Sequence, residues 1–173
     1  MRTEVFMVCP PWDHYRAYKR SAIWLMDNIP RKMMNAKEAF AFIADCLFKM
    51  SAPEHVVFIW VPNKFTEECR DYMKRLDYQY HQYFVWIRPK WKLGTTKQVA
   101  EYLMVFYKGK QPPKIEFAET FAQPFTGKVK SRDQKPDDAY AMIEARFPYG
   151  DKLQVYGFTR RPGWDVCHRN LKK

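Results

Sequence analysis

The sequence predicts an α/β fold, an open sheet with helices on its faces. Short runs of β-branched and aromatic residues alternate along the chain with segments whose apolar residues recur at helical spacing. Residues 56–61 are apolar throughout, which is typical of a strand buried on both faces of a parallel sheet. The chain of 173 residues is 47% hydrophobic and 28% charged, as globular proteins are, and we expect a single domain over residues 1–173.

The first strand and the first helix have clear boundaries. Residues 5–8 form an apolar run that must end at Cys9-Pro10-Pro11, because two prolines cannot continue a hydrogen-bonded ladder. Asn35 and Glu38 have the spacing of a capping box, which starts a helix that we expect to reach about Met50.

A second strand and helix follow directly. Residues 55–61 are rich in β-branched and aromatic side chains and end at Pro62-Asn63, which indicates a buried strand. Thr66 is expected to cap the next helix. The apolar stripe of that helix consists of Cys69, Tyr72, Met73 and Leu76.

The second half of the chain continues the alternation. Residues 80–87 and 101–107 are predicted strands joined by a basic loop. Residues 109–133 have no clear period and indicate a long loop. Pro136 is expected at the first position of a third helix, and residues 153–158 form the last predicted strand.

Charge and cysteine usage restrict the class of partner and the setting. A net charge of +11 predicts a polyanionic partner, either nucleic acid or an acidic membrane. A membrane surface is the less favoured of the two, because the sequence has no basic amphipathic helix and no apolar run of membrane length. The four cysteines have neither metal-ligand spacing nor the pattern of a disulfide framework. We therefore expect no metal site and a cytoplasmic location, in a host cell if a phage encodes the chain.

The tetrapeptide Cys9-Pro10-Pro11-Trp12 is the most informative motif, because it follows a predicted buried strand at the end where α/β folds place their ligands. Six further segments follow this motif along the chain: FIWVPN at 58–63, VWIR at 85–88, EYLMV at 101–105, KPDDAY at 135–140, LQVYG at 153–157 and RPGWDV at 161–166. Together they resemble the DPPW methyltransferases, the METTL-type family of adenine-N6 methyltransferases that act on RNA or DNA. The resemblance covers nearly the whole chain.

The resemblance implies a three-layer Rossmann-like methyltransferase fold with a mixed, mainly parallel sheet. It implies S-adenosylmethionine as the cofactor and an exocyclic base amine, adenine N6 or cytosine N4, as the methyl acceptor. DNA or RNA is then the expected partner, together with a homologous methyltransferase subunit, since active and degenerate domains pair in this family.

The catalytic residues implied by the resemblance are those of the Cys9-Pro10-Pro11-Trp12 turn. The Pro10 carbonyl is expected to accept a hydrogen bond from the target amine, and the Trp12 ring to stack on an extruded base. Cys9 stands where the family has aspartate, and a thiol accepts hydrogen bonds less well than a carboxylate. A small hydroxyl suffices at this place in related enzymes with SPPY or SPPF. The alternative is that Cys9 is a small buried hydrophobe closing a strand.

The resemblance also implies a set of cofactor-binding residues. Lys135 would pair with the methionine carboxylate, Gln154 replaces a glutamate that bonds the ribose, and Asn63 matches an asparagine after a strand. His168 and Arg169 stand where the family places residues against the ribose and adenine. The alternatives are an exposed lysine before a helix for Lys135 and a simple turn for Asn63.

A basic stretch with an interleaved aromatic predicts contacts to nucleic acid, because cations bind phosphates while an aromatic ring stacks on bases. The alternative for this stretch is a solvated loop. The expected contact residues are Arg88, Lys90, Trp91, Lys92, Arg160 and Arg161.

Departures from the family pattern leave the catalytic status open. Cys9, Gln154 and Arg169 all differ from the family at functional positions. A catalytically inactive relative, which binds nucleic acid or supports an active partner subunit, is therefore the second hypothesis beside an active methyltransferase.

Overall fold

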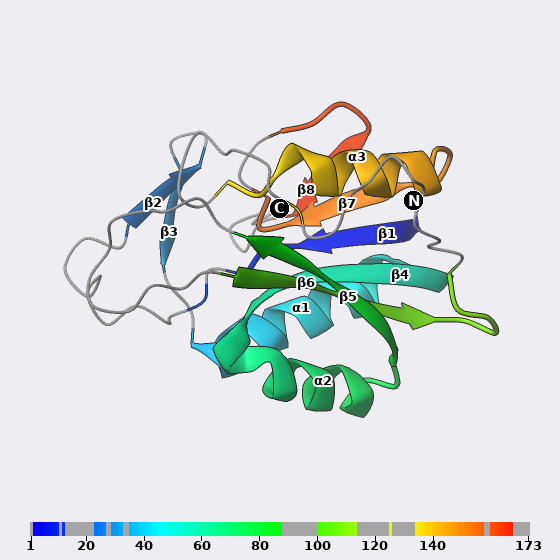
Figure 1. The fold of residues 1–173 in the computed structure, drawn as a ribbon, viewed down its shortest axis with the longest axis horizontal. Helices are drawn as coiled ribbons and strands as arrows, with labels where there is room; N and C mark the ends of the chain where they lie inside the picture. The colour runs from blue at the N-terminus through cyan, green and yellow to red at the C-terminus, as the bar shows by residue number, and fades with distance from the viewer. Residues whose placement is uncertain are drawn as a thin grey trace.

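Six strands form one sheet with helices on both of its faces (Figure 1). The computed structural model describes residues 2–10, 12, 23–26, 29–32, 35–87, 100–113, 125, 134–157 and 160–167, with the backbone alone for 23–26 and 29–32. The elements are β1 (Thr3–Val8), β2 (Ile23–Met26), β3 (Ile29–Lys32), α1 (Ala36–Met50), β4 (Ser51–Pro62), the 3-10 turn η2 (Asn63–Phe65), α2 (Thr66–Arg75), β5 (Gln79–Ile87), β6 (Ala100–Lys108), α3 (Asp137–Arg146), β7 (Lys152–Val155) and β8 (Trp164–Cys167). The predicted α/β class is confirmed.

The sheet is mixed and mainly parallel, as the resemblance implied. Its strand order is β5-β6-β4-β1-β7-β8. β4 and β7 flank β1 and are parallel to it, β8 is parallel to β7, and β6 is antiparallel to both of its neighbours. The chain moves from β1 to one side of the sheet and later returns to the other side as β7. The β1/β7 boundary is thus a point where strand order reverses, and such boundaries are where open α/β sheets bind ligands.

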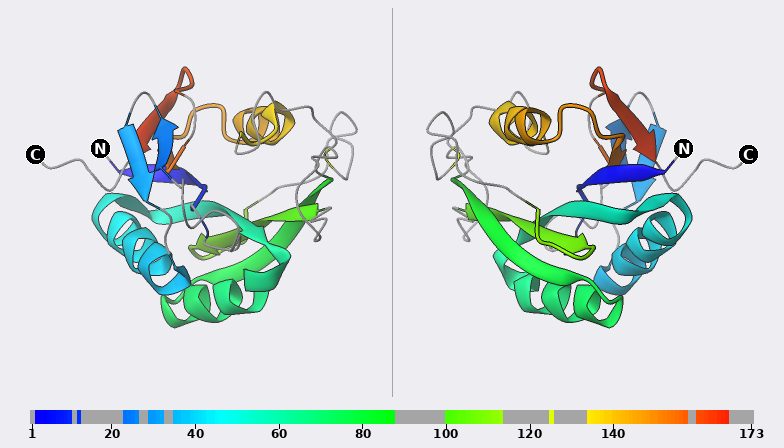
Figure 2. Two further views of the ribbon diagram at one scale, coloured as in Figure 1. Left: turned by 90° about the vertical axis from the view of Figure 1, so that its left-hand side faces the viewer. Right: turned by 90° about the vertical axis from the view of Figure 1, so that its right-hand side faces the viewer.

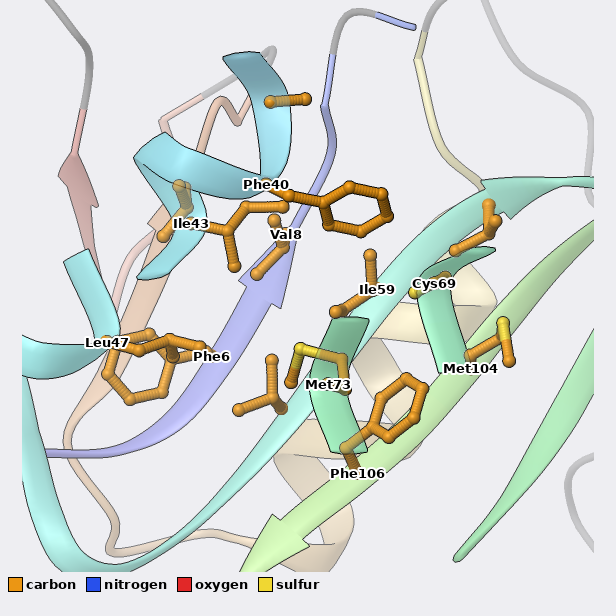
Figure 3. Packing of buried hydrophobic residues seen from close by; sticks show 14 of the residues in the cluster. Phe6, Val8, Phe40, Ile43, Leu47, Ile59, Cys69, Met73, Met104 and Phe106 are labelled. Atoms are coloured by element: carbon orange, nitrogen blue, oxygen red, sulfur yellow. The ribbon is translucent and has the colours of Figure 1, made fainter. Parts of the chain in front are cut away.

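The helices cover opposite faces of the sheet, α1 and α2 on one and α3 on the other (Figure 2). Successive residues of β1 alternate between the two cores, because side chains of a strand point to opposite faces. Phe6 and Val8 pack in the cluster under α1 and α2, whereas Val5 and Met7 pack in the cluster under α3. Figure 3 shows the first of these clusters, where side chains from β1, α1, β4, α2 and β6 meet.

The helix starts match the sequence predictions in one case and correct them in two. Asn35 caps α1 through the predicted box, its Oδ1 accepting the Glu38 N–H at 2.9 Å. The prediction that Thr66 caps the second helix is wrong, because η2 precedes α2 and gives Thr66 helical dihedrals already. The Thr66 hydroxyl instead donates to the Asn63 carbonyl at 3.0 Å. Pro136 is the N-cap of α3 and not its first residue, since its ψ is 138°.

Two further differences concern the strands. β7 ends at Val155, earlier than the predicted 158, because Tyr156 adopts a left-handed conformation with φ 61°. β8 and the β2–β3 hairpin were not predicted. The hairpin lies beyond the edge at which the parallel strands end (Figure 1).

No helix in the described part of the chain is long and apolar enough to cross a membrane.

Candidate functional site

The edge at which the parallel strands end brings together residues from both ends of the chain. Cys9 follows β1 at the β1/β7 boundary, where its backbone N–H donates to the Val155 carbonyl at 2.9 Å. Gln154 is the third residue of β7, and Lys135 lies just before α3. Three of the residues that the sequence assigned to the site therefore lie at one edge of the sheet or at the helix start beside it.

Cys9, Tyr140 and Gln154 form a buried polar group that we call the thiol cluster. The Tyr140 hydroxyl, from α3, donates to Gln154 Oε1 at 3.3 Å and also contacts the Cys9 side chain. Cys9 is 1% exposed and Gln154 is 0% exposed. Burial raises the pKa of Tyr140 well above its usual value, and the adjacent Cys9 adds to the shift. The tyrosine is therefore neutral and acts as a donor.

The turn after β7 closes over Gln154. A Cβ atom added at Gly157 would lie 2.2 Å from Gln154 Oε1 and 2.8 Å from its Cβ, which is far inside contact distance. The glycine thus permits the turn to approach a buried carboxamide that a larger residue would displace.

The Pro10 carbonyl and the Trp12 side chain have different surroundings. Pro10 accepts the Trp12 backbone N–H at 2.9 Å, which uses one of the two lone pairs of its carbonyl oxygen. Trp12 is 3% exposed, its indole N–H donates to the Trp60 carbonyl at 2.8 Å, and its ring stacks on Phe65 at 5.2 Å. The structure places Trp12 in the α1/α2 core, so stacking on a base, as the sequence predicted, requires the ring to leave this packing. Pro11 is outside the described residues.

Lys135 is held in a second polar group, the ion-pair cage, formed with Glu101, Trp60 and Trp86. The Lys135 ammonium forms a salt bridge to Glu101 Oε1, and the two side chains are 10% and 4% exposed. The same ammonium lies 5.2 Å from the ring centroid of Trp60 and 5.7 Å from that of Trp86. A carboxylate and two aromatic faces together stabilise the buried positive charge.

A carboxylate-bearing cofactor fits the ion-pair cage under one condition. Lys135 has three N–H donors, and the indole N–H of Trp60 is buried and lacks an acceptor among the described residues. The donors of Lys135 suit the methionine carboxylate that the resemblance implies for this residue. The condition is that the ligand shares Lys135 with Glu101 or displaces it.

Sequence reasoning did not assign a role to Glu101 or Tyr140. Both lie in segments that carry the family resemblance, EYLMV and KPDDAY. A glutamate inside an otherwise apolar strand was the available signal for Glu101, because a buried carboxylate needs a partner.

Asn63 does not join the other predicted cofactor residues. It lies in η2 and lines a pocket of about 280 Å³ between α2 and the β5–β6 pair. The other lining residues are Thr66, Glu67, Arg70, Tyr83, Tyr102 and Met104. Tyr102 and Met104 pack on the α1/α2 face, whereas Tyr140 packs on the α3 face. The sheet therefore separates this pocket from the thiol cluster.

Arg161 is bound to α3 instead of extending into solvent. Its guanidinium forms a salt bridge with Asp137, and the guanidinium carbon Cζ lies 3.8 Å from the ring centroid of Tyr140. Arg160 is exposed. The remaining predicted cofactor and nucleic-acid residues fall outside the described part of the chain: Arg88, Lys90, Trp91, Lys92, His168 and Arg169.

A comparison with protein-family models identifies one family that matches nearly the whole chain. The family model described as MT-A70 matches residues 3–169, a range that contains every strand and helix from β1 to β8. A search of the curated proteins finds no match.

Proposed function

This chain belongs to the MT-A70 family, the family of METTL-type adenine-N6 methyltransferases, and from that premise we propose that it transfers a methyl group from S-adenosylmethionine to an exocyclic base amine of DNA or RNA. The observation that carries the proposal is the position of the Cys9-Pro10 turn. It follows the central strand at the β1/β7 boundary, beside Gln154 and Tyr140.

The chain's contribution to the reaction is to accept hydrogen bonds from the N–H groups of a poorly nucleophilic amine. An amine conjugated to a purine or pyrimidine ring becomes more nucleophilic when its N–H groups donate to oriented acceptors. The second lone pair of the Pro10 carbonyl supplies one such acceptor. The Cys9 thiol supplies a small neighbour, the counterpart of the serine hydroxyl in SPPY turns.

The cofactor is assigned to the α3 side of the same edge. S-adenosylmethionine, when bound, supplies an electrophilic methyl group on a positively charged sulfur. Lys135 holds the carboxylate of the ligand, and Gln154, oriented by the Tyr140 hydroxyl, replaces the family's ribose-binding glutamate. The net charge of +11 supports a nucleic acid as the substrate, because phosphates are its complementary groups.

One observation favours a second function, that of a catalytically inactive relative. The thiol cluster holds a thiol, a phenol and a carboxamide, and Cys9 is 1% exposed. No member of this cluster is a carboxylate, so the amine would lack the charged acceptor found in the family. In that case the chain binds nucleic acid or supports an active partner subunit.

The two functions are separated by cofactor binding and methyl transfer. Calorimetric titration of the full chain with S-adenosylmethionine is expected to give a dissociation constant in the micromolar range, about −8 kcal/mol of binding free energy. Labelled-methyl transfer to DNA and RNA oligonucleotides, followed by nucleoside analysis, is expected to yield N6-methyladenine or N4-methylcytosine.

Substitutions at Cys9 identify its part in the reaction. Cys9→Ser keeps a small hydroxyl and is expected to retain transfer, whereas Cys9→Ala is expected to lose most of it while still binding the cofactor. An inert wild-type chain in which Cys9→Asp creates transfer would support the inactive relative. Equal transfer by wild type and Cys9→Ala would show that the thiol has no role.

A further inference from the structure

Two cysteines that are distant in the sequence lie in contact in the fold. Cys46 is in α1 and Cys167 is the last residue of β8, 121 positions later. Their Sγ atoms are 3.4 Å apart. The sequence predicted no disulfide, and none of the four cysteines is in a disulfide in this structure.

We propose that Cys46 and Cys167 form a redox modification site, at which a low-molecular-weight disulfide such as oxidised glutathione converts the two thiols into an intramolecular disulfide between α1 and β8. This inference is independent of the proposed methyltransferase function.

The two sulfurs lie close to bonding distance. A disulfide has an S–S length of about 2.0 Å, so the two sulfurs must approach by roughly 1.4 Å from their present separation of 3.4 Å. Metal binding is a weaker explanation of the pair, because no group of three or more His, Cys, Asp or Glu in the described ranges could hold an ion.

The surroundings give the two thiols different roles. Cys167 is partly exposed, while Cys46 is buried in α1. The hydrogen bond from Cys46 lowers the pKa of Cys167, and the same contact together with burial raises the pKa of Cys46. Asp45 raises both pKa values, and Lys49 lowers both. Cys167 is therefore the thiol that reacts first.

The reaction is a balanced pair of thiol–disulfide exchanges. The Cys167 thiolate attacks one sulfur of oxidised glutathione, whose S–S bond breaks, and one glutathione leaves as a thiol. The Cys46 thiolate then attacks the Cys167 sulfur of the mixed disulfide and displaces the second glutathione. The protein loses two hydrogen atoms, and the reagent gains them as two reduced thiols.

The disulfide would immobilise a strand end that is connected to the candidate site. The Cys167 carbonyl accepts the backbone N–H of Tyr156 at 3.1 Å. Tyr156 follows Val155, whose carbonyl accepts the Cys9 N–H at 2.9 Å. Backbone hydrogen bonds thus join the modification site to the turn that begins at Cys9.

The test uses the reduced full chain treated with oxidised glutathione, then alkylated and analysed by intact mass and by peptide mapping without reduction. The expected product has lost two hydrogen atoms and yields a peptide pair that joins Cys46 to Cys167. Cys69→Ala is the matched control, because the Cys69 side chain on the inner face of α2 is completely buried, and this variant is expected to give the wild-type product.

Single substitutions distinguish the order of attack. Cys46→Ser is expected to trap one glutathione on Cys167, and Cys167→Ser is expected to form neither adduct nor disulfide. Circular dichroism checks that both variants fold. The proposal is overturned if the wild-type chain keeps both thiols alkylatable after oxidation, if the cross-link involves Cys9 or Cys69, or if a folded Cys46→Ser traps no glutathione.

Discussion

The two faces of the sheet bury different kinds of group at the same edge. On the α1/α2 face, Trp12 packs against the rings of Phe40 and Phe65. On the α3 face, that edge buries the thiol cluster and the ion-pair cage. Buried polar groups lower stability unless they are hydrogen-bonded or paired. Their concentration on one face supports the proposal that the reaction takes place on the α3 side, while the α1/α2 side supplies apolar packing.

The buried histidine of the α1/α2 face does not weaken this contrast. His55 lies near the opposite end of β4, with Nε2 2.6 Å from the Tyr78 hydroxyl and Nδ1 2.7 Å from the Ala52 carbonyl. Both ring nitrogens thus have structural partners away from the edge where the parallel strands end.

The largest loss of stability is expected from substitutions at Trp12. If the ring is packed in the core, its removal lowers the free energy of unfolding, whereas a ring that only stacks on bases could be removed without this loss. Trp12→Ala removes a buried indole and the donor to the Trp60 carbonyl, and should lower the free energy of unfolding by about 3–5 kcal/mol. Trp12→Phe keeps an aromatic ring and should lose about 1–2 kcal/mol. Urea denaturation measures both. A Trp12→Ala chain as stable as the wild type, but inactive in methyl transfer, would contradict the packing role.

Loss of either charged residue of the ion-pair cage should lower the stability of the chain strongly. Glu101→Gln and Lys135→Met each leave one charge buried without its partner, and each should lower stability by about 3 kcal/mol. The double variant should recover much of that loss, which a double-mutant cycle in urea measures.

The same variants test whether Lys135 binds the cofactor carboxylate in competition with Glu101. Glu101→Gln removes the competing carboxylate and should tighten S-adenosylmethionine binding, whereas Lys135→Met should weaken it. If calorimetry shows that both variants weaken binding equally, the ligand does not compete with Glu101 for Lys135.

The smallest expected effect is the pH dependence of stability that His55 contributes on the α1/α2 face. Burial lowers the pKa of His55, and Lys108 adds to the shift, which the Ala52 carbonyl partly opposes. Because the unfolded chain then binds the proton more readily, the His55 contribution to stability is complete above the ordinary pKa of about 6.5 and declines as the pH falls below it. His55→Gln should reduce this decline, measured by thermal unfolding at several pH values. His81, whose pKa burial also lowers, is left unchanged in this comparison. An unaltered decline in His55→Gln would assign the effect elsewhere.

Most of the fold could be predicted because its signals are local. The capping box at Asn35 needs only Glu38, three residues away, and the prolines after β1 end that strand wherever it lies. β8 could not be predicted, because Trp164–Cys167 is four residues long and is defined by its pairing with β7.

The resemblance assigned both Cys9 and Gln154 to the site, and the pairing of β1 with β7 brings the two residues to one edge of the sheet. The buried indole of Trp12 donates to a carbonyl 48 positions away, and Lys135 pairs with a glutamate 34 positions away. Such contacts follow from strand order, which no local pattern specifies.

The amino-acid sequence by itself determined the order of the strands and helices other than β2, β3 and β8, the end of β1 at its two prolines and the cap of α1. Each of these depends on neighbours within a few positions, where backbone geometry and side-chain spacing are sufficient. Only the tertiary structure decided that Trp12 packs inside, that Glu101 pairs with Lys135 and that Cys46 meets Cys167. Each of these contacts joins segments that are far apart in the sequence, so it depends on how the strands and helices pack together.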